Sequence, residues 1–301
     1  IILSVALLLS YRPSERTTEI SVIQPNVPCY EDERKASGKM QPTNDIINLI
    51  TKVPASSSFM LMPESALAYI PGIGSVDESR MEYITPFLDS FVGDNHPNTK
   101  LITGASTMVR YGDTKATNTA HYYKDYGWYD RYNSALLVND KGMVEDIYHK
   151  GKLVIGVEAV PMKGIFDFLE IDLGGITGQL GWGKEFKVFS NGGVNIGPSI
   201  CYEGLYGNHF AGFARNGAEV MALVSNDGWW GDTPGHKRLF DFCRLRAIEC
   251  RRAIARSANT GISGFISATG KTIGERLEWN EEGILTAELE LRNDKPIYTM
   301  Y

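Results

Sequence analysis

Residues 194–210, VNIGPSICYEGLYGNHF, join an apolar strand pattern directly to a helical pattern, with Cys201 at the junction. Three aromatic residues after the cysteine recur with the spacing of one helical face: Tyr206, Phe210 and Phe213. A thiol at such a turn lies at the carboxyl end of a sheet, where free backbone N–H groups favour a thiolate and can stabilise an oxyanion. The stretch therefore predicts a nucleophilic cysteine, with a buried structural cysteine as the alternative.

Short apolar runs and amphipathic helical patterns alternate on both sides of this stretch, which predicts an α/β fold. Strands are expected at 20–24, 58–62, 101–106, 134–139, 194–200, 220–225, 255–267 and 284–290. Helices are expected at 43–53, 79–92, 204–216 and 235–252. A hairpin with a turn at Gly127 is expected over 120–142, where tyrosines form cross-strand pairs, and ligand stacking by Tyr126 or Trp128 is the alternative.

The composition excludes several classes of protein. The 301 residues include 30 Lys and Arg against 36 Asp and Glu, a net charge of −6, so the chain lacks the basic footprint of a nucleic-acid binder. With 43% hydrophobic residues, it is also neither disordered nor collagen-like. The cysteines contain no C-x-x-C pair, and a chain of this length needs no disulfide framework: Cys29, Cys201, Cys243 and Cys250.

The first ten residues, IILSVALLLS, form an apolar run that is too short to cross a bilayer, which takes about 20 residues. Taken alone, the run is the end of a transmembrane helix, the remnant of a signal peptide or a buried first strand. No linker or repeat divides the remaining chain. We therefore expect an N-terminal segment, residues 1–17, followed by one catalytic domain over residues 18–301.

A nucleophilic thiol needs a base, for which histidine is the usual residue. The chain has five histidines, and none lies at a position that suggests a catalytic base: His96, His121, His149, His209 and His236. His209 follows Cys201 by eight residues and is expected to be a solvated or capping residue. Carboxylates are better candidates.

Glu64 follows the predicted strand 58–62 and Pro63, which delivers its carboxylate to the carboxyl edge of the sheet. Lys150 follows a β-like run, and Glu158 comes eight residues later, so the lysine can hold an oxyanion while the glutamate positions the ammonium. Lys152 competes for the same role. The alternatives are a surface acid for Glu64 and a solvated salt bridge for the lysine and glutamate.

Together, the segments LMPESA, YHKGKLVIGVE and PSICYEGLYG resemble, in order and spacing, the Glu-Lys-Cys triad of the nitrilase superfamily of carbon-nitrogen hydrolases. Within that superfamily the chain is most similar to the apolipoprotein N-acyltransferases, through QPNVP, YNSALLV, GGITGQLGWGKEFKVF, VSNDGWWG and RLRAIECRRAIARSANTGISGFIS. The resemblance covers residues 18–301. The chain departs from the family in VIGVE, where members carry Pro-Phe-Gly before the glutamate, and at Glu33, where a tryptophan is frequent.

The resemblance implies a four-layer α-β-β-α sandwich that needs no cofactor or metal. It also implies roles for six residues. Cys201 is expected to be the nucleophile, Glu64 the general base and acid, and Lys150 the stabiliser of the tetrahedral intermediate. Glu158 supports these groups, and Tyr202 and Glu203 occupy positions that are functionally important in the family.

The implied reaction transfers an acyl chain from a phospholipid to the N-terminal α-amine of a diacylglyceryl-cysteine lipoprotein, through a thioester on Cys201. The expected partners are therefore phospholipid, lipoprotein and membrane, and the expected location is a bacterial inner membrane, with the catalytic domain on the periplasmic side. Residues 1–10 would end a membrane helix, and the apolar residues 153–169 would form a lipid-contacting lid. The alternatives are a soluble nitrilase-type amidase with the same triad and a catalytically silent lipid-binding domain.

Overall fold

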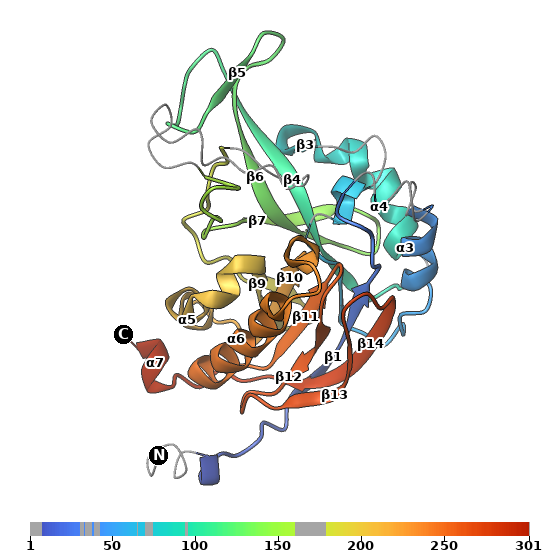
Figure 1. Ribbon diagram of the computed structural model, residues 1–301, viewed down its shortest axis with the longest axis vertical. Helices are drawn as coiled ribbons and strands as arrows, with labels where there is room; N and C mark the ends of the chain where they lie inside the picture. The colour runs from blue at the N-terminus through green and yellow to red at the C-terminus, as the bar shows by residue number, and fades with distance from the viewer. Residues whose placement is uncertain are drawn as a thin grey trace.

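Two β-sheets lie face to face in the part of the chain that the computed structural model describes, residues 8–30, 33, 38, 43–64, 66–69, 75–93, 96–159 and 179–300 (Figure 1). The first sheet has the order β14 (Gly283–Glu290), β1 (Thr17–Gln24), β2 (Phe59–Leu61), β4 (Lys100–Gly112), β6 (Gly127–Val138) and β5 (His121–Tyr123), with β3 (Ser75–Asp77) on β4 and β7 (Val144–His149) on β6. The second has the order β13 (Thr272–Leu277), β12 (Ser263–Ile266), β11 (Ile254–Ala258), β10 (Val220–Ser225), β9 (Val194–Ile200) and β8 (Phe189–Asn191).

The main core lies between the two sheets, because alternate side chains of a strand point to opposite faces. Ile20 and Val22 of β1 belong to one buried cluster with Ile196 of β9 and Val224 of β10. Ile23, the next residue along β1, belongs instead to a second cluster on the outer face of the first sheet. The first sheet is therefore buried on both faces.

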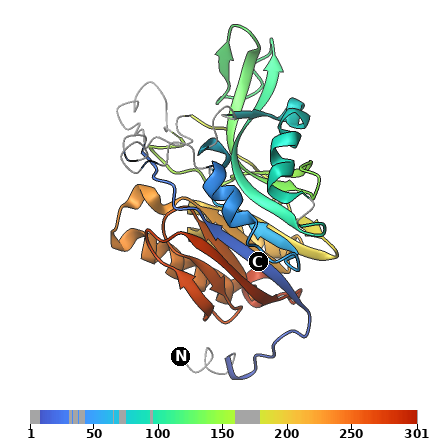
Figure 2. The ribbon, with the colours of Figure 1, turned by 90° about the vertical axis from the view of Figure 1, so that its right-hand side faces the viewer.

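Helices cover the two outer faces (Figures 1 and 2). Helices α3 (Thr43–Ile50) and α4 (Thr85–Val92) cover the first sheet, where Ile46 and Leu88 pack in the same cluster as Met60 of β2. Helices α5 (Gly207–Arg215) and α6 (Pro234–Cys250) cover the second sheet, and the short α7 (Ile297–Met300) contacts both of them. The order helix, sheet, sheet, helix confirms the predicted α-β-β-α sandwich.

Two predicted elements are each divided in the structure. The expected strand 255–267 is the antiparallel pair β11 and β12, which turns at Gly261, where φ is +146° and an added Cβ would lie 2.4 Å from the Asp227 carboxylate. The expected helix 79–92 begins as a 3₁₀ segment, η2 (Glu78–Ile84), and becomes α-helical only at Thr85, beside Pro86 in its first turn. Both differences depend on single residues, Gly261 at the turn and Pro86 in the first turn of the helix, which the periodicity of apolar residues does not report.

The predicted hairpin forms between β5 and β6, and β6 starts at Gly127, where φ is +78°. Tyr122 lies opposite Trp128 with ring centroids 5.5 Å apart, and Tyr123 stacks on Tyr126 at 4.8 Å. Cross-strand packing of the tyrosines is therefore confirmed.

The N-terminal apolar run lies largely outside the described residues, which include only Leu8, Leu9 and Ser10 of it. Among the described residues, no helix has the length and apolar character that a membrane span requires.

Candidate active site

Three loops at the strand ends bring the predicted catalytic residues together. Glu64 follows β2, Lys150 follows β7, and Cys201 follows β9 of the other sheet, so face-to-face packing of the sheets is needed to assemble the group. The Lys150 Nζ lies 3.1 Å from Glu64 Oε1 and 2.9 Å from Glu158 Oε1. Lys150, Glu64 and Glu158 are 1%, 4% and 3% exposed, which rules out the surface-acid and solvated salt-bridge alternatives.

The carboxylates of Glu64 and Glu158 are each held by a backbone N–H through the second oxygen, the one that does not contact Lys150. The Asn226 N–H donates to Glu64 Oε2 at 3.0 Å, and the Val154 N–H donates to Glu158 Oε2 at 2.8 Å. Neither glutamate can therefore rotate without breaking hydrogen bonds at both oxygens.

Asn133 completes this group, although the sequence interpretation assigned it no role. Its side-chain amide donates to Glu64 Oε1 and to Glu158 Oε1, both at 2.7 Å. The residue lies in the segment YNSALLV, which supported the family resemblance without indicating what the asparagine contacts.

Cys201 has an unusual backbone conformation for a residue with a side chain. Its φ is +48°, in the left-handed region, which costs about 1 to 3 kcal/mol and persists only where the surroundings enforce it. The chain continues as a short 3₁₀ segment, η4 (Cys201–Leu205), before α5 begins at Gly207. The predicted strand-to-helix turn is therefore present, but the 3₁₀ segment comes before the α-helix.

The Cys201 thiol is held in its protonated form. Burial raises its pKa well above the usual value, and the charge of Glu64 raises it further, whereas the ammonium of Lys150 lowers it by less. Burial and the charge of Glu64 thus oppose the thiolate that the N-terminus of the helix was expected to favour. A base must remove the proton when the sulfur attacks, and Glu64 is the carboxylate whose charge acts most strongly on the Cys201 thiol.

Lys150 remains a cation. Burial alone would lower the pKa of its amine, but the charges of Glu158 and Glu64 raise it well above the usual value. The site thus contains a buried positive charge, which is the kind of group that can stabilise a developing oxyanion.

Glu203 is fully buried behind the nucleophile and ties two loops together. Its Oε1 accepts hydrogen bonds from the Gly151 N–H at 2.6 Å and the Tyr148 hydroxyl at 2.6 Å, and its Oε2 accepts from the Ile200 N–H at 2.7 Å. Burial would raise the pKa of this carboxyl, but His209 and these hydrogen bonds lower it below the usual value. Glu203 therefore connects the Lys150 loop to the Cys201 turn as an anion.

His209 is 5% exposed and its Nε2 lies 3.0 Å from Glu203 Oε1, so the expected solvated or capping role is wrong. The spacing of eight residues between Cys201 and His209 gave no sign of this contact, because the extended backbone of Tyr206 separates η4 from α5.

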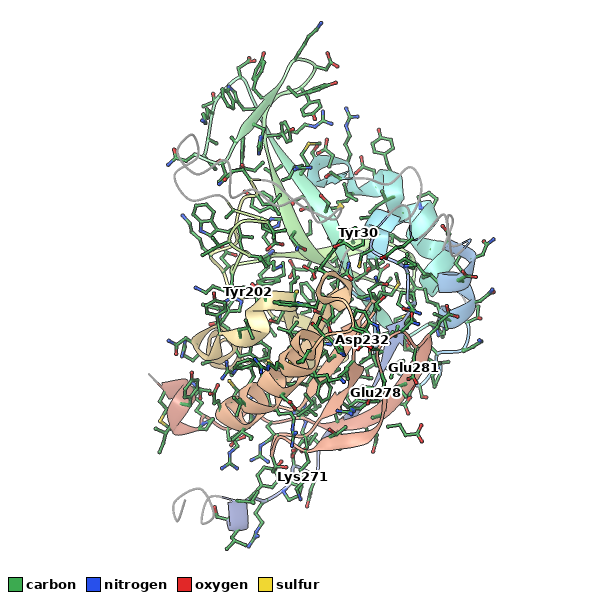
Figure 3. All side chains as sticks on the ribbon, viewed as in Figure 1. Tyr30, Tyr202, Asp232, Lys271, Glu278 and Glu281 are labelled. Carbon is green, nitrogen blue, oxygen red and sulfur yellow. The ribbon has the colours of Figure 1, made fainter. Side chains whose placement is uncertain are left out.

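Tyr202 and Lys152 lie at the outer side of the group. The Tyr202 ring packs edge-on against Tyr206, with centroids 5.5 Å apart, at the start of α5 (Figure 3). The exposed Lys152 places its Nζ over the Tyr206 ring at 5.5 Å, away from the Glu64 and Glu158 oxygens that Lys150 contacts. The structure therefore selects Lys150 over Lys152 as the buried lysine.

A second buried network, which sequence reasoning also missed, lies next to Cys201. A hydrogen bond with Ser225 lowers the pKa of the Cys201 thiol, against the larger effect of burial. The Ser225 hydroxyl donates to Asp227 Oδ1 at 2.7 Å, and both Asp227 oxygens lie 2.9 Å from Arg256 Nη2. Asp227 falls in VSNDGWWG and Arg256 in ARSANTG, two segments of the family resemblance.

The structure describes only residues 153–159 of the predicted lid, residues 153–169. Ile155 is 71% exposed, and Val154 and Val157 are partly exposed. Three other lid candidates lie outside the described residues: Phe166, Phe168 and Leu169.

Comparison with solved structures identifies the same fold. A nitrilase-superfamily protein, Nit3 of Saccharomyces cerevisiae, matches with a TM-score of 0.61 at 15% identity and covers 93% of this chain and 92% of its own. An amidase from Nesterenkonia sp. matches with a TM-score of 0.59 at 17% identity and covers 96% of this chain and 94% of its own.

Comparison with curated sequences gives nearer relatives. An apolipoprotein N-acyltransferase of Chlorobaculum tepidum is 31% identical over 256 residues, which are 80% of this chain and 45% of the relative. Another from Wigglesworthia glossinidia brevipalpis is 27% identical over 267 residues, 87% of this chain and 48% of the relative. The chain thus spans about half the length of these relatives. The profile of the carbon-nitrogen hydrolases matches residues 24–294, and the chain therefore belongs to the carbon-nitrogen hydrolase family.

Proposed function

We propose that the protein is an acyltransferase that moves an acyl chain from a phospholipid to the α-amine of a diacylated lipoprotein through a thioester on Cys201. The observation that carries this proposal is the match to apolipoprotein N-acyltransferases over 80 to 87% of the chain. The amidase alternative has less support, because the amidase structures are below 20% identical and indicate a shared fold alone.

In the first half-reaction, Glu64 removes the proton of the Cys201 thiol while the sulfur attacks the ester carbonyl of the phospholipid. The raised pKa of the thiol supports this order, because little thiolate exists before a base acts. Lys150 and the backbone N–H that follows Cys201 stabilise the oxyanion. The intermediate collapses to the thioester, and Glu64 returns its proton to the departing lyso-lipid oxygen.

In the second half-reaction, the α-amine of the lipoprotein attacks the thioester carbonyl. Glu64 accepts a proton from the attacking amine, and the carbon–sulfur bond breaks as the amide forms. The proton then returns to the Cys201 sulfur, so the enzyme ends in its starting state. Lys150 remains charged in both halves because its pKa is raised by the glutamates around it.

The outer side of the site supports an amphiphilic substrate. Ile155 presents an exposed apolar side chain, and Lys152 presents a cation on the same loop, flanked by the Tyr206 ring. An acyl chain packs against apolar side chains, and a phosphate is attracted to a lysine. A small polar amide would need neither feature.

A membrane location is part of the proposal, because both substrates are anchored in lipid. It is supported by exposed apolar residues in the N-terminal segment and in α7, which both lie in the lower half of Figure 1. These residues are Leu8, Leu9, Ile297 and Met300. Tyr11, whose ring lies under Arg251 and Arg292 nearby, has the mixed aromatic and cationic character of an interface anchor. We assign the protein to a bacterial inner membrane, with this domain on the periplasmic side.

The experiment that tests the proposal separates the two half-reactions. The protein, as its gene encodes it, is mixed with phospholipid vesicles, and intact mass is measured for one fatty acyl group on Cys201. A diacylated lipopeptide with a free α-amine is then added. The adduct is expected to persist without the peptide and to discharge onto it, because a transferase of this kind requires that water attack the thioester slowly.

A lipopeptide with an acetylated α-amine is the matched control, and it is expected to leave the adduct intact. Rapid release of free fatty acid that does not depend on the peptide would favour the hydrolase. Absence of any adduct with phospholipid, in a protein whose Cys201 still reacts with a small activated ester, would contradict the phospholipid donor.

A further inference from the structure

Asn133 is the neutral member of an otherwise charged group. It lies on β6, is 2% exposed and donates its two amide hydrogens to Glu64 Oε1 and Glu158 Oε1, each at 2.7 Å. Its own backbone oxygen accepts the Lys150 N–H at 2.8 Å. A single residue thus contacts the general base, its supporting glutamate and the main chain of the lysine.

The orientation of the Asn133 amide is set by these contacts. Turning the amide over would place its oxygen 2.7 Å from two carboxylate oxygens, where no proton is available to bridge them. In the adopted orientation, Asn133 Oδ1 is buried and has no hydrogen-bond partner among the described residues. A buried acceptor without a partner is destabilising, so packing alone does not explain an asparagine here.

The charges in the group explain what a neutral donor provides. Glu64 and Glu158 both place their Oε1 atoms within 3.1 Å of one ammonium, so two carboxylates share a single cation. Two like charges at such a distance oppose each other's ionisation, whereas each N–H donor favours the ionised form. A second lysine or an arginine would also hold both carboxylates ionised, but its charge would weaken Glu64 as a base.

We propose that Asn133 is a positioning residue that keeps Glu64 ionised and aimed at the Cys201 thiol, by linking Glu64 to Glu158 through its side-chain amide. The inference rests on the proposed function only for the role of Glu64 as the base. It does not depend on whether the acyl acceptor is an amine or water.

The test compares Asn133→Leu, Asn133→Asp and Ser134→Ala in the intact protein. Leucine has a similar size and removes both amide donors, whereas aspartate keeps the shape and adds a third carboxyl group. Ser134→Ala is the matched control, because Ser134 is the next residue of β6, fully buried, and hydrogen-bonded on the opposite face to Thr107 and His149. Acylation of Cys201 by a short-chain activated ester is followed by intact mass from pH 5 to 9.

Asn133→Leu is expected to slow acylation at pH 7 by about 10- to 100-fold, the range for a lost hydrogen bond to a charged group. The acid limb of the variant's profile, where the acylation rate falls as pH is lowered, is expected to move to higher pH. The reason is that ionised Glu64 has lost a hydrogen-bond donor. Asn133→Asp should move the limb further, because three carboxyl groups oppose one another's ionisation. Ser134→Ala should leave the limb in place.

A merely structural role gives a different pattern. In that case all three variants would slow acylation in proportion to their loss of thermal stability, with the acid limb unmoved, and the inference would be wrong. Asn133→Leu also removes the unpartnered oxygen, so it remains testable if Asn133→Asp does not fold. Because the ester acylates Cys201 without phospholipid or lipopeptide, a failure of the proposed function would leave these outcomes unchanged.

Discussion

Two buried glutamates flank the nucleophile, and they are held in different ways. Glu203 accepts three backbone N–H groups, from Gly151, Lys152 and Ile200, at 2.6, 3.2 and 2.7 Å. Among the described residues, Glu64 accepts one backbone hydrogen bond, from the Asn226 N–H at 3.0 Å, and its other hydrogen bonds come from the side chains of Asn133 and Lys150, which it shares with Glu158.

This difference separates two roles. We call Glu203 the anchor, because it holds the backbone of two loops, and Glu64 the reacting group, because it is the expected base. A carboxylate that holds several main-chain amides of two loops cannot take up a proton without loosening both loops. A carboxylate with mostly side-chain donors can exchange a proton while the backbone around it stays in place. We therefore expect changes at Glu64 to affect chemistry, and changes at Glu203 to affect chemistry and folding together.

The largest effect is expected at the nucleophile itself. Cys201→Ala should lower acyl transfer by about 10⁴-fold or more, because no thioester can form. Alanine at Cys29, Cys243 or Cys250 should leave transfer within a few-fold of wild type, since these buried thiols do not lie in the turn that follows β9. Transfer is measured with phospholipid and a diacylated lipopeptide, and activity retained by Cys201→Ala would disprove the assignment.

Replacing Glu64, the base, or Lys150, the cation, is expected to lower the rate less than replacing Cys201 does. Glu64→Gln is expected to lower acylation of Cys201 by about 10² to 10⁴-fold, because glutamine cannot accept the thiol proton. Lys150→Met should lower it by about 10² to 10³-fold by removing the charge at the oxyanion.

Lys152→Met is the control for the lysine variant, and acylation by a small activated ester should be unchanged in it, since its ammonium lies over the Tyr206 ring. The opposite result, with Lys152→Met damaging and Lys150→Met silent, would reverse the assignment of the two lysines.

Glu203→Gln tests the anchor side of the comparison. Glutamine keeps one acceptor oxygen, and its NH2 group would face a backbone N–H that the carboxylate accepts, so we expect the free energy of unfolding to fall by about 1 to 3 kcal/mol, with a smaller loss of acylation rate than in Glu64→Gln. Urea unfolding followed by fluorescence measures the first quantity. If both variants unfold at the wild-type midpoint, the distinction between anchor and reacting group fails.

The pH dependence of stability sharpens the same distinction. The pKa of Glu203 is lowered in the folded protein, so its ionised form contributes stability that is fully present above the unfolded value of about 4.3. That contribution is lost as pH falls below this value toward the folded pKa. Wild-type protein should therefore lose more stability between pH 5 and pH 3 than Glu203→Gln, as measured by thermal melting, and parallel curves would contradict the linkage.

The smallest effect on stability is expected at Tyr148, a side-chain donor to Glu203. Tyr148→Phe removes one hydroxyl that donates to Glu203 at 2.6 Å but leaves the backbone donors in place. Unfolding free energy should fall by about 0.5 to 1.5 kcal/mol, and the acid limb of the acylation profile should not move. A shifted limb would mean that Tyr148 acts on the base and does not belong to the anchor alone.

The residues that the sequence could indicate are those at the ends of apolar strands. Glu64 and Cys201 follow such strands directly, and the structure places both at the same end of the sandwich. Asn133 could not be found in this way, because it lies within β6 and its two glutamate partners are 69 and 25 residues away in the chain. Asp227 and Arg256 were missed for the same reason, since their ion pair joins segments 29 residues apart.

By itself, the sequence determined the α/β layers, the position of the cysteine turn and the family, because apolar periodicity and short motifs are local properties of the chain. Only the tertiary structure decided which lysine is buried, that His209 meets Glu203, and that the resting thiol is protonated. Burial and the distances between distant charges set these properties, and both depend on two sheets packing face to face.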